Sequence, residues 1–307
     1  MIMTPTITRP TSLAAWFERF QQTGLPLMAE STQHGVRYQA QSTDLFISPF
    51  LKCGTTWLQQ IVHGLRTGGA MDFDDISRVV PWLETAHMLG LDLQAPQLGA
   101  FQAFKSHLSW DALPKGGRYI VSFRNPKDAL ISLYHFFDGW MWEAGAVSLA
   151  EFAGSELVGA YYLANRGPRS YWHHLASWWE QRHNQNVLLL CFETMKEDLP
   201  ALVQDIAGFI GLELPEDLQE LIVRQSSLDF MLAHKTKFDD LLMRECFEKI
   251  GFLPPGGDAA KVRKAQLGDQ RVELPADISA ALDAIWRDEI QARFGLTSYQ
   301  ALCEALA

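Results

Sequence analysis

A short apolar strand, a turn with a lysine and a glycine, and a helix constrain the fold of this chain more than any other feature. The strand is predicted over residues 45–48, and the helix has an apolar stripe over 58–65 with the spacing i, i+3, i+4 and i+7. The turn contains Lys52 and Gly54. Because the first amides of a helix have no internal partner and lie at its positive end, such a unit can bind an anion. An ordinary strand-to-helix turn capped by a threonine would have the same pattern, and the Walker A pattern GxxxxGK[ST] is absent.

Strands and helices alternate along the rest of the chain. Further strands are predicted at residues 101–105, 119–123 and 187–192. Helices are predicted at residues 13–22, 72–89 (with an aromatic break at 80–84), 148–164, 168–182, 199–210 and 277–294, with one more after Asn125 and Pro126. This alternation predicts an α/β fold with a central, mostly parallel sheet covered by helices on both faces. Since no linker interrupts residues 43–192, we expect a single domain over 1–307, with residues 1–12 loose.

The composition argues against several classes of protein. The chain has 307 residues and a formal net charge of −10, whereas nucleic-acid and membrane-surface binders need a broad basic face. Its four cysteines lie far apart without CxxC spacing, so neither a zinc site nor a disulfide framework is indicated. No apolar run is long enough to cross a bilayer, and the first twenty or so residues lack the apolar core of a signal peptide. We therefore expect a cytoplasmic protein that binds no nucleic acid.

The regular pattern weakens in the last third of the chain. It fades over residues 234–268, and the Pro-Pro-Gly-Gly run at 254–257 interrupts it. Long irregular segments of compact domains are often lids or binding loops. We therefore expect 234–268 to be a lid or nucleotide-binding loop, of which residues 234–265 become ordered when nucleotide binds.

Basic side chains follow the ends of the predicted strands. They are Lys52, Lys105, His107 and Arg124. Ligands of parallel sheets bind beyond the carboxyl ends of the strands, and several positive groups on one rim are costly unless an anion neutralises them. Each residue alone has an ordinary explanation, such as a hydrogen-bonded structural histidine or an arginine paired with Asp128. Their convergence favours an anionic ligand.

Five short motifs occur in an order that resembles the cytosolic-type sulfotransferases. They are KxGTTW after the first strand, KxH and RNPKDxxxS at later strand ends, then FETMKED and RKxxxGD. The resemblance extends over roughly residues 24–270. It implies transfer of a sulfuryl group from 3′-phosphoadenosine 5′-phosphosulfate (PAPS) to an alcohol, phenol or amine, with 3′-phosphoadenosine 5′-phosphate (PAP) as the product. The carboxylates form no evident metal-ligand pattern, so no metal is expected.

The resemblance also implies how the donor is held. Lys52, Gly54, Thr55 and Thr56 would bind the 5′-phosphosulfate, and Trp57 would stack near the adenine. The 3′-phosphate would be held by four side chains: Arg124, Ser132, Arg263 and Lys264. Three further nucleotide-site positions depart from the family pattern: Phe192 replaces a Tyr, Ser226 a Thr and Leu228 a Phe.

The implied chemistry rests on three side chains. His107 would be the general base for the acceptor hydroxyl, Lys52 would stabilise the bridging oxygen, and Lys105 would support the sulfuryl oxygens. A sulfuryl group in transfer spreads its charge over its oxygens, so positioning and cationic groups supply most of the catalysis. A histidine that titrates near neutrality suits the removal of a hydroxyl proton.

Aromatic residues are candidates for the walls of an acceptor pocket, which we expect to be largely apolar. The predicted pocket residues are Phe20, Trp82, Trp110, Phe137, Trp140, Trp142, Phe238 and Phe247. Any one of them could equally belong to a hydrophobic core, where most aromatic residues lie. The sequence does not choose among a phenol, a steroid, a fatty alcohol and an amine.

Other departures from the family pattern affect reactivity and assembly. Cys53 stands where a Ser is usual, at a helix N-terminus beside a lysine, where the pKa of a thiol can fall; alternatively, only backbone amides matter there. Ala265 and Gln270 replace a Gly and a Trp of the 3′-phosphate loop. The usual dimer segment is not recognisable over 270–283, so the oligomeric state stays open. Two alternatives are a non-catalytic nucleotide binder and a nucleotide kinase. A binder would not need to keep a general base, and a kinase would need a Walker-type lysine.

Overall fold

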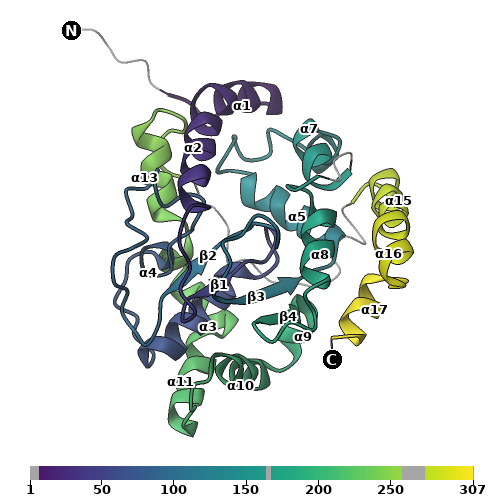
Figure 1. Ribbon diagram of the computed structural model, residues 1–307. Helices are drawn as coiled ribbons and strands as arrows, with labels where there is room; N and C mark the ends of the chain where they lie inside the picture. Colours follow the sequence, from purple (N-terminus) through teal and green to yellow (C-terminus); the bar gives the residue numbers. More distant parts are fainter. Residues whose placement is uncertain (1–6, 164–166, 258–273, 307) are drawn as a thin grey trace, which may run out of the picture.

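The computed structural model describes residues 7–163, 167–257 and 274–306. Its centre is a sheet of four parallel strands in the order β2-β1-β3-β4 (Figure 1). The strands are β1 (Leu45–Ile47), β2 (Ala103–Lys105), β3 (Arg118–Phe123) and β4 (Val187–Cys191). The predicted α/β fold with a parallel sheet is confirmed, and each predicted strand is present with small differences at its ends.

Helices surround this sheet (Figure 1). In chain order they are α1 (Leu13–Arg19), α2 (Leu25–Gly35), α3 (Thr55–Thr67), α4 (Ile76–Val79), α5 (Pro126–Phe137), α6 (Leu149–Ala153), α7 (Glu156–Val158), α8 (Tyr171–Trp179), α9 (Phe192–Glu197), α10 (Leu199–Ile210), α11 (Glu216–Gln225), α12 (Leu228–Ala233), α13 (Leu241–Lys249), α15 (Ala276–Ile285), α16 (Ala292–Phe294) and α17 (Tyr299–Glu304). Wider π-helical turns join some of them, at Phe20–Gly24, Gly159–Leu163 and Trp286–Gln291.

The two faces of the sheet belong to two hydrophobic cores. In β1, Leu45 and Ile47 lie in a core with helices α3 and α10, whereas Phe46 lies in the other core with α5 and α8. All three side chains are almost fully inaccessible to solvent. Because successive side chains of a strand point to opposite faces, a strand covered on both faces is apolar at most of its positions. This explains the short, continuous apolar runs of the sequence.

The helix predicted over residues 72–89, with an aromatic break at 80–84, forms only before the break, since only Ile76–Val79 is helical there. The following residues instead lie along the outer edge of β2. The amide of Lys105 donates to the carbonyl of Pro81 at 2.8 Å, and the amide of Leu83 donates to the carbonyl of Lys105 at 2.8 Å. Tertiary pairing with a sheet edge therefore overrides the apolar spacing of this stretch.

Two other expectations about helices need correction. The N-terminal helix does not end near residue 22 but continues to Gly35, because Pro26 falls in the first turn of α2, where its missing amide costs nothing. Residues 234–268 are not one irregular segment, because α13 and a 3₁₀ turn over Lys235–Phe238 lie within them. The rest of that predicted lid, from residue 258, lies outside the described residues, so its ordering by nucleotide stays a prediction, as does the single domain over 1–307. Among the helices described, none is long and apolar enough to span a membrane.

Candidate active site

One cavity of about 620 Å³ lies beyond the carboxyl ends of the strands. The predicted nucleotide-binding and catalytic residues that line it are Lys52, Gly54, Thr55, Thr56, Trp57, Lys105, His107, Arg124, Ser132, Phe192, Ser226 and Leu228. Arg263 and Lys264 lie outside the described residues. The strand register explains the convergence, because Ile47 of β1 is level with Lys105 of β2 and Ile120 of β3. The residues that follow the strands therefore meet on one rim.

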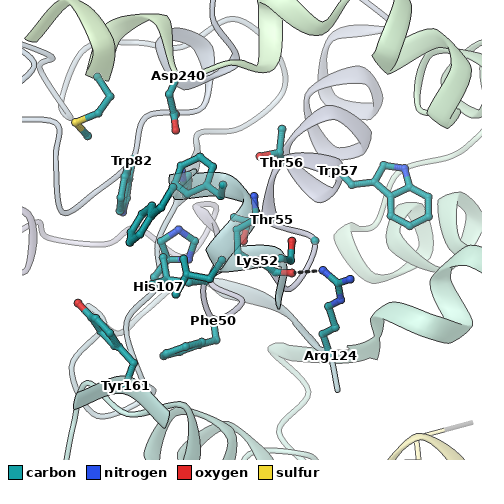
Figure 2. A pocket seen from close by; sticks show the side chains of 18 of the residues that line it. Phe50, Lys52, Thr55, Thr56, Trp57, Trp82, His107, Arg124, Tyr161 and Asp240 are labelled. Atoms are coloured by element: carbon teal, nitrogen blue, oxygen red, sulfur yellow. Dashed lines mark hydrogen bonds between the residues drawn. The ribbon is translucent and has the colours of Figure 1, made fainter. Parts of the chain in front are cut away.

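The cavity has two ends with different chemistry. Figure 2 shows Trp57 and Arg124 on one side and Trp82, His107 and Tyr161 on the other, with Lys52 between them. We call the first the anion end, which comprises Thr55, Thr56, Trp57, Arg124 and Ser226. We call the second the aromatic end, which comprises Phe50, Trp82, His107, Tyr161 and Asp240.

The backbone of the turn before α3 explains its glycine. Gly54 has φ +97°, and a Cβ built there would lie 3.0 Å from the ring of Phe192. A side chain at this position would be strained by the left-handed conformation and would press on the ring. Lys52 also has a positive φ, of +65°. The turn thus delivers the N-terminus of a 13-residue helix, α3, to the cavity.

Cys53 is buried and unreactive in character. Its side chain is inaccessible to solvent, and burial raises the pKa of its thiol to about 12. Its carbonyl accepts a hydrogen bond from the hydroxyl of Ser122. Of the two interpretations of Cys53, the raised pKa argues against a thiol activated by the helix N-terminus, because burial outweighs the nearby positive charges of Lys52 and Arg124.

Three buried polar atoms at the anion end have no hydrogen-bond partner among the described residues. Nη1 of Arg124 donates to the carbonyl of Lys52 at 2.9 Å, and its guanidinium lies 4.5 Å from the ring centroid of Phe192. Within the described part of the chain, Nε of Arg124, Oγ1 of Thr55 and Oγ of Ser226 are buried without a hydrogen-bond partner. Buried polar atoms are normally hydrogen-bonded, so these atoms fit a bound polyanion.

Trp57 has its indole fixed in place at the same end. Its Nε1 donates to the carbonyl of Ser226 at 2.7 Å, and its ring packs edge-on against Phe192 with centroids 6.1 Å apart. Phe192, which replaces the family's usual Tyr, therefore contacts the Trp57 ring, the Arg124 guanidinium and the Gly54 backbone. Its apolar ring organises this end without a hydroxyl.

His107 is held by two hydrogen bonds at the aromatic end. Its amide donates to Oε1 of Glu84 at 2.7 Å, and its Nδ1 lies 2.7 Å from the carbonyl oxygen of Pro49. Since a carbonyl only accepts, Nδ1 carries the proton, and Nε2 is the proton-accepting nitrogen of the neutral ring. Burial raises the pKa of the Glu84 carboxyl.

Both lysines of the predicted mechanism lie over aromatic rings. Nζ of Lys52 is 4.3 Å from the ring centroid of Phe136, and Nζ of Lys105 is 4.0 Å from that of Trp82. The Trp82 ring also meets His107 edge-on, with centroids 5.1 Å apart. Aromatic faces attract cations, so these rings position the ammonium groups beside the cavity.

A model of the sulfotransferase domain matches residues 42–294. The chain belongs to the sulfotransferase family. It is 26% identical over 268 residues to the amine sulfotransferase of Oryctolagus cuniculus, which covers 83% of either chain. It is 32% identical over 236 residues to sulfotransferase 1A1 of Canis lupus familiaris, covering 68% of this chain and 73% of that one. The predicted resemblance is confirmed, and the protein is a sulfotransferase enzyme.

Solved structures show the same fold at low sequence identity. Retinol dehydratase in complex with androsterone and inactive cofactor PAP has a TM-score of 0.66 and 19% identity, covering 87% of this sulfotransferase and 85% of that chain. Mouse sulfotransferase SULT7A1 in complex with PAP has a TM-score of 0.61 and 20% identity, covering 91% and 92% of the two chains. The overall fold of this sulfotransferase is therefore shared with these solved structures.

The predicted acceptor pocket of the sulfotransferase needs partial correction. Phe20, Trp82, Phe137, Trp140 and Phe247 line the cavity. The other three predicted residues do not: Trp110 packs edge-on against Tyr119 and Trp178, Trp142 is fully buried against Phe137 and Phe152, and Phe238 is fully buried near Phe73. Aromatic residues that look alike in sequence are divided by tertiary packing between cavity and core.

Several lining residues were missed from the sequence. They include Phe50, Glu84, Phe136, Tyr161, His174 and Asp240. Phe50, between the first strand and the lysine of the turn, had a positional signal, since residues just beyond strand ends tend to reach the site. Asp240 had none, because it is a buried carboxylate in a left-handed backbone conformation, with φ +50°, just before α13.

Proposed function

We propose that this sulfotransferase transfers a sulfuryl group from PAPS to the hydroxyl, or the amine, of a small and largely apolar acceptor. The observation that carries the proposal is the continuity of one cavity, in which Lys52 lies between an anion end and an aromatic end (Figure 2). Such a cavity suits two substrates that meet at one reacting group. The complexes of related structures with PAP support this choice of donor.

The donor would lie along the anion end. The turn amides and the hydroxyls of Thr55 and Thr56 suit the 5′-phosphosulfate, because a helix N-terminus favours negative charge. Arg124, with Ser132, suits the 3′-phosphate, and Arg263 and Lys264 would join them. Trp57 would stack on the adenine, with Ser226 and Leu228 beside it.

The reaction would be an in-line displacement at sulfur. The acceptor oxygen forms the new S–O bond, the bond from sulfur to the bridging phosphate oxygen breaks, and its electron pair leaves with PAP. The acceptor proton passes to Nε2 of His107, the nitrogen left to accept it by the bond between Nδ1 and Pro49. Lys52 stabilises the bridging oxygen and Lys105 the sulfuryl oxygens, as cationic groups do in phosphoryl transfer.

The acceptor would occupy the aromatic end. Trp82, Phe137, Trp140 and Phe247 present apolar surface to it, with a few polar side chains such as Glu84 and Asp240 among them. Androsterone and retinol in solved relatives are apolar alcohols of this kind. We also propose that the acceptor is a small molecule and that the protein is cytoplasmic.

Replacing the proposed base tests this mechanism. We expect His107→Ala to lower kcat for labelled sulfuryl transfer to a panel of phenols and alcohols by about 10²–10⁴-fold, the usual contribution of a general base. PAP binding, measured by calorimetry, should be nearly unchanged, because His107 lies at the other end of the cavity. His173→Ala is the matched control, since His173 is paired with Asp111 at 2.8 Å and does not line the cavity.

Two outcomes would contradict the proposal in different ways. Undiminished transfer by His107→Ala would show that another group is the base. Failure of the unaltered protein to bind PAP would overturn the assignment of the donor.

A further inference from the structure

We propose that Glu30, His34 and His87 form a surface site for a divalent transition-metal ion of the zinc class. Glu30 and His34 belong to α2, and His87 belongs to the irregular segment that follows α4. One ligand atom from each of the three lies within 4.8 Å of the others. None of them lines the catalytic cavity, so the site is independent of the proposed reaction.

The two imidazoles lie against each other. The rings of His34 and His87 are stacked, with centroids 3.7 Å apart and planes inclined by 10°. Nε2 of His87 lies 4.0 Å from Oε1 of Glu30. Ligand atoms around a tetrahedral zinc ion, each about 2.0–2.2 Å from it, are about 3.4 Å apart. The three donors are therefore within reach of one ion once the stacked rings rotate out of parallel, so that both nitrogen lone pairs point toward it.

The backbone beneath these side chains is fixed by close packing. Glu30 and His34 are four residues apart, which places them on one face of the helix. The amide of Met88 donates to Oγ of Ser31 at 3.1 Å, which ties the neighbour of His87 to the same helix. Near the end of α2, a Cβ on Gly35 would lie only 2.1 Å from the carbonyl oxygen of Leu83, so only glycine permits this approach. The ligands therefore project from two segments whose spacing does not depend on the ion.

The donor set selects the class of ion. Two imidazoles and one carboxylate match Zn²⁺, Ni²⁺ and Cu²⁺, whereas Mg²⁺ and Ca²⁺ prefer oxygen ligands alone. His87 and Glu30 have side-chain exposures of 47% and 63%, so water can complete the coordination. With three protein ligands and a fourth coordination position open to water, the site would exchange its ion with solvent.

Binding would connect two parts of the cavity wall. Helix α2 contributes Met28 and Thr32 to the lining, and the segment that carries His87 contributes Trp82 and Glu84. An ion bound outside would cross-link the two segments. We therefore expect it to raise the thermal stability of the protein, since a ligand that binds only the folded state stabilises it.

The test uses the full, tag-free chain and Zn²⁺ as the probe. We expect one Zn²⁺ per chain in competition with a chromophoric chelator, and a Zn²⁺-dependent rise in Tm that Mg²⁺ does not produce. His34→Ala and His87→Ala should each weaken Zn²⁺ binding by at least about tenfold and remove the rise in Tm. His183→Ala, at an exposed histidine elsewhere, is the matched control and should change neither.

Clear outcomes would overturn the site. Unchanged Zn²⁺ affinity in the double variant His34→Ala/His87→Ala would exclude these ligands, and so would equal weakening by His183→Ala. Loss of binding in Cys246→Ser, with the histidine variants unaffected, would move the ion to the partly exposed thiol of α13. Both readouts, Zn²⁺ binding and Tm, can be measured whether or not the protein transfers a sulfuryl group.

Discussion

The two ends of the cavity are built by different means. The anion end is positioned mainly by backbone geometry. Gly54 turns the chain, α3 presents its N-terminus, and Arg124 follows directly after β3. At the aromatic end, side chains from separated segments pack together, among them Phe50, Trp82 and Tyr161. The turn at the heart of the anion end is therefore local in sequence, although Arg124 and Ser226 reach it from distant segments, whereas the apolar pocket has no such local unit.

This difference explains which of the predicted residues line the cavity. All described residues predicted for the nucleotide line the cavity. Most of them lie at a strand end or in the turn and helix that follow, whereas Ser226 and Leu228 lie where α11 ends and α12 begins. Among the aromatic candidates, Trp110, Trp142 and Phe238 lie in packed surroundings away from it. A Trp in a core and a Trp in a pocket have the same local sequence signal.

The largest effect expected separates core from pocket at the aromatic end. Trp142→Ala should lower the free energy of unfolding by about 3–5 kcal/mol, because it removes a fully buried ring. Trp82→Ala should cost less stability, because Trp82 is only partly buried, but should raise the KM for the acceptor. Urea unfolding and steady-state kinetics measure the two quantities.

A milder variant allows the same comparison if Trp142→Ala fails to fold. Trp142→Phe keeps most of the buried area and should fold with unchanged KM. If Trp142→Phe altered acceptor preference while leaving stability intact, Trp142 would be a pocket residue and the division between core and cavity would be wrong.

The next effect probes the turn between the two ends. Lys52→Met should lower kcat by about 10²–10³-fold, comparable to removal of one preorganised group that stabilises the transition state. The KM for the acceptor should change little, because the aromatic end keeps its walls. Lys249→Met, at an exposed lysine on α13 outside the cavity, serves as control. Equal losses in the two variants would mean that Lys52 acts only through net charge.

The smallest effect concerns pH and the aromatic end. His174 is fully buried with Nε2 2.9 Å from the carbonyl oxygen of Ser48, and burial lowers its pKa from 6.5 to about 3. Between these values the unfolded chain binds a proton that the folded protein does not, so stability falls as pH falls from 6.5 toward 3. His63, whose pKa is lowered to about 4 by burial, acts in the same direction.

Equilibrium unfolding at several pH values tests this linkage. His174→Gln should flatten the loss of unfolding free energy between pH 6.5 and 4 by about 1 kcal/mol per pH unit. His183→Gln, at an exposed position, should leave the slope as it is. A slope that His174→Gln does not change would show that His174 is protonated in the folded protein.

The sequence predicted the strands of the sheet more accurately than the boundaries of the helices. The four strands were evident because strands buried on both faces are apolar at most of their positions. The helix expected over 72–89 formed only before its aromatic break, because Pro81 and Leu83 pair with the edge of β2, a partner distant in sequence. The N-terminal helix was predicted too short. Pro26 lies in the first turn of α2, so it begins a helical segment and does not end one.

The sequence by itself determined the parallel α/β sheet, the turn from Lys52 to Thr56 and the membership of the sulfotransferase family, because these depend on short-range patterns. Only the tertiary structure decided which aromatic rings face the cavity, that burial suppresses the acidity of Cys53, and that His87 meets Glu30 and His34 on α2. Those outcomes depend on burial and on contacts between distant segments. Neither is encoded in the spacing of neighbouring residues.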